Sequence, residues 1–292
     1  MFTIIVNPST GSKSKKILLK KVLSELKKYN LEFDLIYSKS KFDAIRIAEL
    51  AAKDNNIIIA CGGDGHVGEL ANIASKYRVK FGIIPFGSGN DFANQVGIHS
   101  YNIKTITSSL LNNNIKLIDL GKINNKLFCS IAGVGLSSEA NEWANKKKLF
   151  NKNLLYILSF IRTVLFYSPK RIILKVNNNY IEKKIWFIAI ANTKSFGKGM
   201  MIAPDASYND GLLDVVIVEN TSKWELIKTF PLVFKGNHMH HHAVSTFRTN
   251  SIKIENTSTA EPLAVYADGE KVSNLPVNIS VCKHSLKLLV PT

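Results

Sequence analysis

The stretch from Asn56 to Glu69, NIIIACGGDGHVGE, most constrains the fold, because an apolar run there ends abruptly at two glycines and an aspartate. The residues of the run, Ile57–Cys61, are β-branched or small and uncharged. That composition is typical of a strand buried on both faces of a parallel sheet. The pattern becomes helical from Val67 to about Ala74. We therefore predict a strand, a glycine turn and a helix in succession.

The glycine turn is a candidate phosphate site. Gly62, Gly63 and Gly65 are expected to let the backbone adopt positive φ angles. The helix that follows offers unpaired N–H groups and the positive end of its dipole to an anion. Asp64 fits such a site if a divalent cation or a substrate hydroxyl neutralises it. An ordinary α/β turn is the alternative, because one glycine-rich turn is weak evidence.

A second glycine-rich turn favours the phosphate site. The apolar residues Phe81–Pro85 predict another strand, and they lead into Phe86-Gly87-Ser88-Gly89-Asn90-Asp91. Turns at the ends of neighbouring parallel strands face one crevice, which is where open α/β sheets bind ligands. The two turns are therefore expected to form one site.

The sequences CGGDGHVGEL and IPFGSGNDFA together resemble the diacylglycerol kinase catalytic domain family, in particular its bacterial soluble lipid kinases. His66 stands where that family usually has Thr, and Gly68 where it usually has Asn. The resemblance implies ATP and Mg²⁺ as cofactors. It also implies that an NPxxG turn and a residue near Ser38 or Ser40 contact the nucleotide. The implied nucleotide-binding residues are Asn7, Pro8, Thr10, Gly11, Ser38, Gly62, Gly63, Asp64, Gly65, Glu69, Gly87, Ser88, Gly89 and Asn90.

The pattern of elements changes near Ile115. Before it, strands alternate with helices, at 13–29, 42–53, 92–96 and 101–111. After it, short strands dominate, which suits an antiparallel sandwich: they are 115–120, 126–132, 171–176, 184–191, 213–218, 251–255, 265–267 and 277–282. We predict an N-terminal Rossmann-like α/β nucleotide-binding domain over 1–118, completed by 284–292, and a C-terminal antiparallel β-sandwich domain over 119–283.

Two turns in the second half carry the implied chemistry. In the stretch from Ala203 to Asp214, the resemblance implies a structural magnesium held by Asp210 and the carbonyls of Ser207 and Leu212; an Asx-type turn without metal is the alternative. In Ala267-Asp268-Gly269-Glu270, the resemblance makes Glu270 the general base for a lipid hydroxyl, with Asp268 in support. A type I′ turn is the alternative there.

The histidines from His238 to His242 raise the question of a transition metal, with His238 and His242 as a candidate pair. No carboxylate or cysteine adjoins them in the sequence. Surface or hydrogen-bonded histidines are therefore the preferred interpretation.

Charge and apolar segments bear on partners. The chain has 292 residues, with 38 Lys and Arg against 22 Asp and Glu, a formal charge of +16 that attracts anions of any kind. No zinc, RRM or helix-turn-helix pattern indicates nucleic acid. The apolar stretch 154–167 is interrupted by Arg162 and too short to span a membrane, so it is expected to be a core helix or to lie at a membrane surface. The amphipathic segment 224–234 is a candidate lipid-facing element.

Three widely spaced cysteines predict free thiols in a reducing compartment, and the N-terminal residues do not form a secretory signal. We expect a cytoplasmic ATP-dependent lipid kinase at the inner membrane face, a homodimer as soluble members of the resembled family often are, acting on diacylglycerol or a related lipid. The alternatives are an NAD kinase-like small-molecule kinase and an inactive basic membrane-binding protein.

Overall fold

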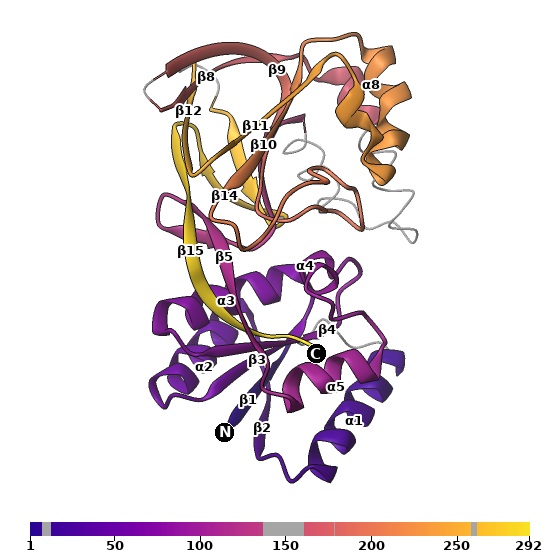
Figure 1. The fold of residues 1–292 in the computed structure, drawn as a ribbon, viewed down its shortest axis with the longest axis vertical. Helices are drawn as coiled ribbons and strands as arrows, with labels where there is room; N and C mark the ends of the chain where they lie inside the picture. Colours follow the sequence, from indigo (N-terminus) through magenta and orange to yellow (C-terminus); the bar gives the residue numbers. More distant parts are fainter. Residues whose placement is uncertain (8–12, 137–160, 178, 258–261) are drawn as a thin grey trace. The chain divides into compact units, whose positions relative to one another are not determined.

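The computed structural model describes residues 1–7, 13–136, 161–177, 179–257 and 262–292 (Figure 1). These residues divide into two compact units. The first unit comprises Met1–Leu120 and Cys282–Thr292, and the second comprises Gly121–Val281. Strands β5 (Ile115–Ile123) and β15 (Val277–Leu289) contribute residues to both units.

A parallel sheet forms the centre of the first unit. Its strands are β1 (Phe2–Val6), β2 (Phe33–Tyr37), β3 (Ile57–Gly62), β4 (Lys80–Pro85) and the end of β15, in the order β2-β1-β3-β4-β15. Nearly every residue of β1, β3 and β4 is buried. Because both faces of these strands are buried, their sequences are uninterrupted apolar runs.

Helices cover the parallel sheet. They are α1 (Lys13–Lys28), α2 (Lys41–Lys53), α3 (Asp64–Tyr77), α4 (Asp91–Gln95) and α5 (Ile103–Leu111). Helix α2 contacts α3, and α1 contacts α5, so the two pairs form layers on opposite faces of the sheet (Figure 1). Because β3 and β4 are parallel, their carboxyl ends share one edge, and α3 and α4 begin beyond it.

The second unit is built on antiparallel strands. They are β6 (Lys126–Phe128), β7 (Ile131–Gly135), β8 (Lys170–Val176), β9 (Asn179–Ala191), β10 (Leu213–Glu219), β11 (Val244–Thr249), β12 (Ser251–Asn256), β13 (Ala264–Ala267) and β14 (Glu270–Asn274). Their inward side chains form a core rich in isoleucine, leucine and valine. Three short helices follow β10 in the chain: α8 (Lys223–Thr229), η2 (Phe230–Lys235) and η3 (Asn237–His240).

Several predicted element boundaries were wrong. The single strand expected over Lys126–Ala132 is two strands, because the N–H groups of residues 129–131 bond a side chain instead of a neighbouring strand. Strand β9 begins at Asn179, five residues early, since it forms a hairpin with β8. Strands β11 and β14 were not predicted, because their polar sequences, VSTFRT and EKVSN, lack an apolar run.

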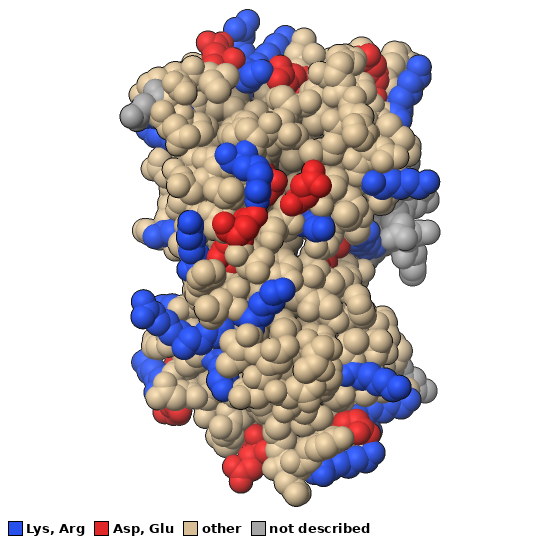
Figure 2. Space-filling view, viewed as in Figure 1, with Lys and Arg blue, Asp and Glu red and all other residues tan. Residues whose placement is uncertain are grey.

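The three cysteines are free, and Cys61 and Cys129 are buried. Among the described residues, no helix has the length and apolar character needed to cross a membrane. Of the predicted apolar stretch 154–167, residues 154–160 lie outside the described part of the chain. On the face drawn in Figure 2, lysine and arginine side chains are scattered over both units rather than gathered in one patch.

Candidate functional site: two glycine turns and a carboxylate turn

The first glycine turn is tighter than the sequence predicts. Helix α3 begins at Asp64 itself, with Gly63 as its N-cap at φ −93°. None of Gly62, Gly63 and Gly65 has a positive φ, so that expectation was wrong. The helix starts early because the chain turns directly from β3 into α3, which leaves no room for a left-handed residue. The N–H groups at the start of α3, which the helix itself does not pair, therefore lie at the edge of the sheet.

Close backbone packing explains glycine at Gly63 and Gly87. A Cβ added to Gly63 would lie 2.9 Å from the Cα of Gly87, and one added to Gly87 would lie 2.6 Å from the Cα of Gly63. Both distances are shorter than side chains tolerate, so the two turns can touch only where neither residue has a side chain. The structure thus brings together the two turns that the sequence predicted to share one site.

Asp64 and Asn90 bond the two turns to each other. The Asp64 carboxylate accepts the N–H of Asn90 at 2.8 Å and the N–H of Phe92 at 3.3 Å. Asn90, in the left-handed region at φ 57°, accepts the N–H of Gly87 at 2.6 Å and donates to Ser100 Oγ at 2.7 Å. Both side chains therefore hold backbone in place and fix the shape of the edge.

The electrostatics of this edge favour a cationic or hydrogen-donating partner. Burial raises the pKa of the Asp64 carboxyl, and the neighbouring carboxyl of Asp91 raises it further, while the N–H groups of Phe92 and Asn90 lower it. Two acidic groups lie together beside a helix N-terminus that itself attracts anions. An anion that brings its own cation, as a nucleotide brings Mg²⁺, satisfies both tendencies.

His66, the departure from the family pattern, has a structural contact. Its Nε2 lies 3.0 Å from the carbonyl oxygen of Ile5 in β1, and its ring packs where a Cβ on Gly62 would be. Burial lowers the pKa of His66. A neutral ring that donates from Nε2 to Ile5 therefore ties α3 to β1.

The other predicted nucleotide residues of the first unit are placed as follows. Ser38 is buried, and its hydroxyl donates to the carbonyl of Val6 at 3.1 Å. Glu69 forms a 2.7 Å ion pair with Lys41. The N–H of Asn7 donates to the carbonyl of Cys61 at 3.0 Å, which places Asn7 beside the end of β3. Pro8, Thr10 and Gly11 lie outside the described residues.

In the second unit, the carboxylate of Asp268 is held by backbone. It accepts the N–H of Cys129 at 2.7 Å, of Ser130 at 2.9 Å and of Ile131 at 3.3 Å. Asp268 itself is left-handed at φ 49°, in the turn between β13 and β14. This carboxylate therefore anchors the segment between β6 and β7. These contacts could not be predicted from the sequence, because 138 positions separate Asp268 from Ser130.

Glu270 follows the same turn, and its carboxylate is accessible to solvent. It is the first residue of β14, its side chain is 40% exposed, and the Nζ of Lys126 lies 3.7 Å from its carboxylate. An exposed carboxylate beside a lysine can accept a proton from a solvent-side donor. The turn thus separates an anchored carboxylate from an accessible one.

The predicted metal turn contains both a hydrogen-bonded aspartate and excess negative charge. The N–H of Leu212 donates to Asp210 Oδ1 at 3.1 Å, which is the Asx turn of the alternative interpretation, and Arg248 pairs with Asp210. Asp214, 3.4 Å from Arg248 Nε, has a buried Oδ2 that accepts no hydrogen bond from the described residues. Two carboxylates on one guanidinium, one of them with a buried unbonded oxygen, fit a hard cation in addition to Arg248.

Comparison with known families supplies the decisive observation. Residues 1–123 match the model of the diacylglycerol kinase catalytic domain, and residues 130–290 match the model of the YegS C-terminal NAD kinase beta sandwich-like domain. The chain belongs to the YegS-like diacylglycerol kinase family. The predicted family is therefore confirmed, and the protein is a phosphotransferase with an alcohol acceptor.

Members of this diacylglycerol kinase family are similar over nearly the whole chain. A diacylglycerol kinase from Mycobacterium tuberculosis is 29% identical over 297 residues, covering 99% of this chain and 94% of its own. The diacylglycerol kinase of Bacillus subtilis is 28% identical and covers 94% and 90%. The crystal structure of a diacylglycerol kinase from Bacillus anthracis superposes with a TM-score of 0.79 at 23% identity, covering 99% and 96%. The predicted fold class, an α/β domain followed by a β-sandwich domain, is confirmed.

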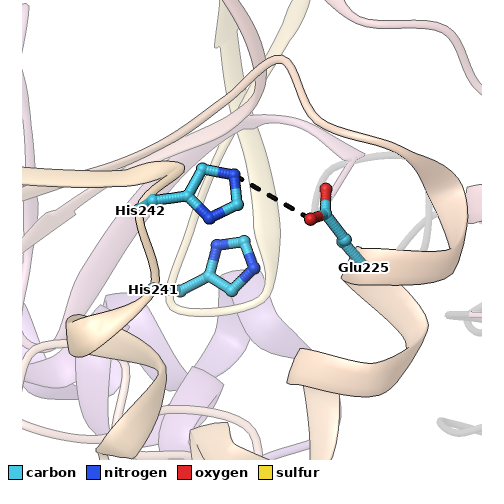
Figure 3. Close-up of side chains that lie close together, drawn as sticks. All are labelled: Glu225, His241 and His242. Carbon is cyan, nitrogen blue, oxygen red and sulfur yellow. Dashed lines mark ion pairs between the residues drawn. The ribbon is translucent and has the colours of Figure 1, made fainter.

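The histidines from His238 to His242 differ in burial and in their contacts. His238 is buried, with its Nε2 3.2 Å from the carbonyl of Ile202, so it is a hydrogen-bonded core residue, as preferred. No carboxylate adjoins these histidines in the sequence, but the fold brings Glu225 within 3.9 Å of His242 (Figure 3).

Proposed function

We propose that the protein is an ATP-dependent lipid kinase that transfers the γ-phosphate to the hydroxyl of diacylglycerol or a related lipid. The observation that carries the proposal is the contact of the two glycine turns through Asp64 and Asn90. Such an edge, with a helix N-terminus beside the buried carboxyl group of Asp64, suits a triphosphate that arrives with Mg²⁺. The similarity to proteins named diacylglycerol kinase supports a lipid acceptor.

The nucleotide would be held by the two glycine turns, with Gly63, Gly65 and Gly87 allowing close approach of phosphate oxygens. Mg²⁺ supplies charge neutralisation on the phosphates when bound. A second Mg²⁺ would be structural, held by Asp210 with the carbonyls of Ser207 and Leu212. The excess carboxylate around Arg248 supports that assignment.

Glu270 is proposed as the general base and Asp268 as a positioning residue. As the lipid oxygen forms its bond to the γ-phosphorus and the bond to the leaving ADP oxygen breaks, the hydroxyl proton passes to the Glu270 carboxylate. The exposure of Glu270, which leaves its carboxylate accessible to a substrate hydroxyl, supports this role. The three N–H contacts of Asp268 support a role in holding the turn rather than in touching the substrate.

An apolar patch on the second unit is the proposed membrane-docking surface. The helical residues 161–166 and the segment from α8 to η2 are joined by a hydrogen bond from Lys223 Nζ to the carbonyl of Leu165. Five of their large apolar side chains are 41–78% exposed: Leu165, Phe166, Trp224, Leu232 and Phe234. Four basic residues belong to the same segments: Arg162, Lys223, Lys228 and Lys235. Apolar side chains among lysines fit an anionic lipid surface.

The test is transfer of radiolabelled γ-phosphate from ATP to lipid in mixed micelles, with Mg²⁺ and a panel containing diacylglycerol, a sphingoid base and a polyprenol. We expect lipid-dependent transfer with diacylglycerol, reduced at least about 100-fold by Glu270→Gln. Binding of ATP without transfer to any lipid of the panel would contradict the proposal. Cytoplasmic location at the inner membrane face and a homodimer remain predictions, to be checked by fractionation and by light scattering.

A further inference from the structure

Three side chains of the second unit gather between α8 and the turn before β11. Glu225 in the first turn of α8, and His241 and His242 in the turn before β11, each offer a ligand atom, and these atoms lie within 4.8 Å of one another. The imidazole rings of His241 and His242 stack, with centroids 4.4 Å apart. Figure 3 shows both rings facing the carboxylate of Glu225.

The spacing is close to that of a metal site. Two ligands bound to one ion at about 2.1 Å in tetrahedral geometry lie about 3.4 Å apart. His242 Nε2 and Glu225 Oε1 are 3.9 Å apart, and their side chains are 72% and 42% exposed. Because both side chains are exposed, a small rotation of either can shorten this distance by the roughly 0.5 Å required. A small movement would therefore let His242 and Glu225 each coordinate the same ion.

The carboxylate is already oriented for such a role. Glu225 forms a capping box with Ser222, and its Oε2 also accepts the hydroxyl of Thr221. These bonds use one oxygen and leave Oε1 as the atom nearest His242. Outer partners of this kind fix the direction of a ligating carboxylate.

His241 is the weaker ligand of the three. Its Nδ1 accepts the N–H of Ala243 at 3.2 Å. A neutral imidazole has one nitrogen lone pair, so binding an ion through His241 costs this hydrogen bond. His242 and Glu225 are therefore expected to carry most of the affinity, and His241 to complete the set.

We propose that Glu225, His241 and His242 form a binding site for a divalent transition metal ion of the zinc type. Two imidazoles and a carboxylate suit Zn²⁺, Ni²⁺, Co²⁺ or Cu²⁺ rather than Mg²⁺. A bound ion would fasten the first turn of α8 to the turn before β11. The proposal does not depend on lipid kinase activity.

The experiment titrates the full-length protein with Zn²⁺ alone against a chromophoric chelator, and repeats the titration with Co²⁺ to read coordination from its visible absorption. We expect one ion per chain and an affinity at least about tenfold lower in His242→Ala and Glu225→Gln, with a smaller loss in His241→Ala. Glu225→Gln is a matched change, because glutamine also serves in a capping box. His240→Ala, at an exposed histidine outside the cluster, is the control and should leave affinity unchanged.

Two results would overturn the proposal. One is an affinity that is the same in the wild type and in His242→Ala. The other is an equal loss in His240→Ala and His242→Ala, which would indicate unspecific binding by surface histidines.

Discussion

The Asp64 carboxylate accepts the backbone N–H of Asn90 at 2.8 Å, although 26 positions separate the two residues in the chain. Asp64 belongs to the turn after β3 and Asn90 to the turn after β4. The GGDG sequence suggests that its aspartate binds substrate. In the structure, Asp64 also connects the two turns through its hydrogen bonds. Its removal should therefore affect stability as well as activity.

Asp64→Ala is expected to lower the free energy of unfolding by about 2 kcal/mol, because two N–H groups, of Asn90 and Phe92, lose their acceptor. Asp64→Asn keeps an acceptor oxygen and should cost less. Urea denaturation of both variants measures the difference. Equal stability of Asp64→Ala and the wild type would show that the contact does not brace the turns.

Substitution of Asp268 should mainly lower stability, whereas substitution of Glu270 should mainly lower phosphate transfer. Asp268→Ala removes the acceptor of three N–H groups and is expected to cost about 3 kcal/mol of stability. Glu270→Gln should leave stability within about 0.5 kcal/mol of the wild type, because the side chain is 40% exposed, while phosphate transfer falls at least about 100-fold. Paired measurements of urea denaturation and lipid phosphorylation check both. Full activity in Glu270→Gln would rule out its role as base.

The buried parallel strands and the glycine turns that follow them could be predicted from local sequence. The apolar runs of β3 and β4 and the glycine turns after them follow from residue type, because a strand buried on both faces needs such a run. The end of β4 follows from the same stretch, and the helix predicted over 92–96 is α4, which begins one residue earlier at Asp91. Polar strands such as β14 could not be read, since their pairing with β13 depends on tertiary neighbours.

Individual side-chain contacts between distant segments could not be predicted from the sequence. Nothing near His66 indicates that its ring reaches the carbonyl of Ile5, 61 positions away. Nothing near His242 indicates Glu225, which α8 brings alongside. Residue type predicted which side chains carry chemistry, while the fold decided which of them brace backbone and which remain accessible.

Protonation of Glu219 at low pH should lower the stability of the second unit. This residue of β10 pairs with Lys183 at 2.6 Å and accepts the hydroxyl of Ser245 at 2.8 Å, and the hydrogen bond from Lys183 holds its pKa below the usual 4.5. A lowered pKa in the folded state stabilises the protein above pH 4.5, and this contribution is lost as the pH falls through the folded-state pKa.

Glu219→Gln is therefore expected to cost about 1 kcal/mol at pH 7, a value already reduced for partial exposure, and less at pH 3. Urea denaturation at both pH values tests this. The control is Glu182→Gln, in the exposed pair with Arg171, where the cost should stay below about 0.5 kcal/mol. A cost for Glu219→Gln that does not change with pH would contradict the assignment.

Membrane docking should depend on the apolar patch. Trp224→Ser removes a side chain that is 73% exposed, and we expect about tenfold weaker binding to vesicles containing anionic lipid, since each tenfold corresponds to about 1.4 kcal/mol of transferred apolar surface. Phe42→Ser is the matched control, because Phe42 is 83% exposed but lies on α2 in the first unit. Sedimentation with vesicles measures both. Equal losses in the two variants would place docking elsewhere.

The parallel sheet of the first unit is completed by the last residues of the chain, where Lys287 and Leu288 of β15 pair with Lys80 and Phe81 of β4. A ribosome releases residues 121–281 before these residues leave the exit tunnel. The usual order of folding, N-terminal part first, is therefore reversed: the second unit can finish while β4 still has an open edge. During synthesis, the first unit of this kinase is therefore completed after the second.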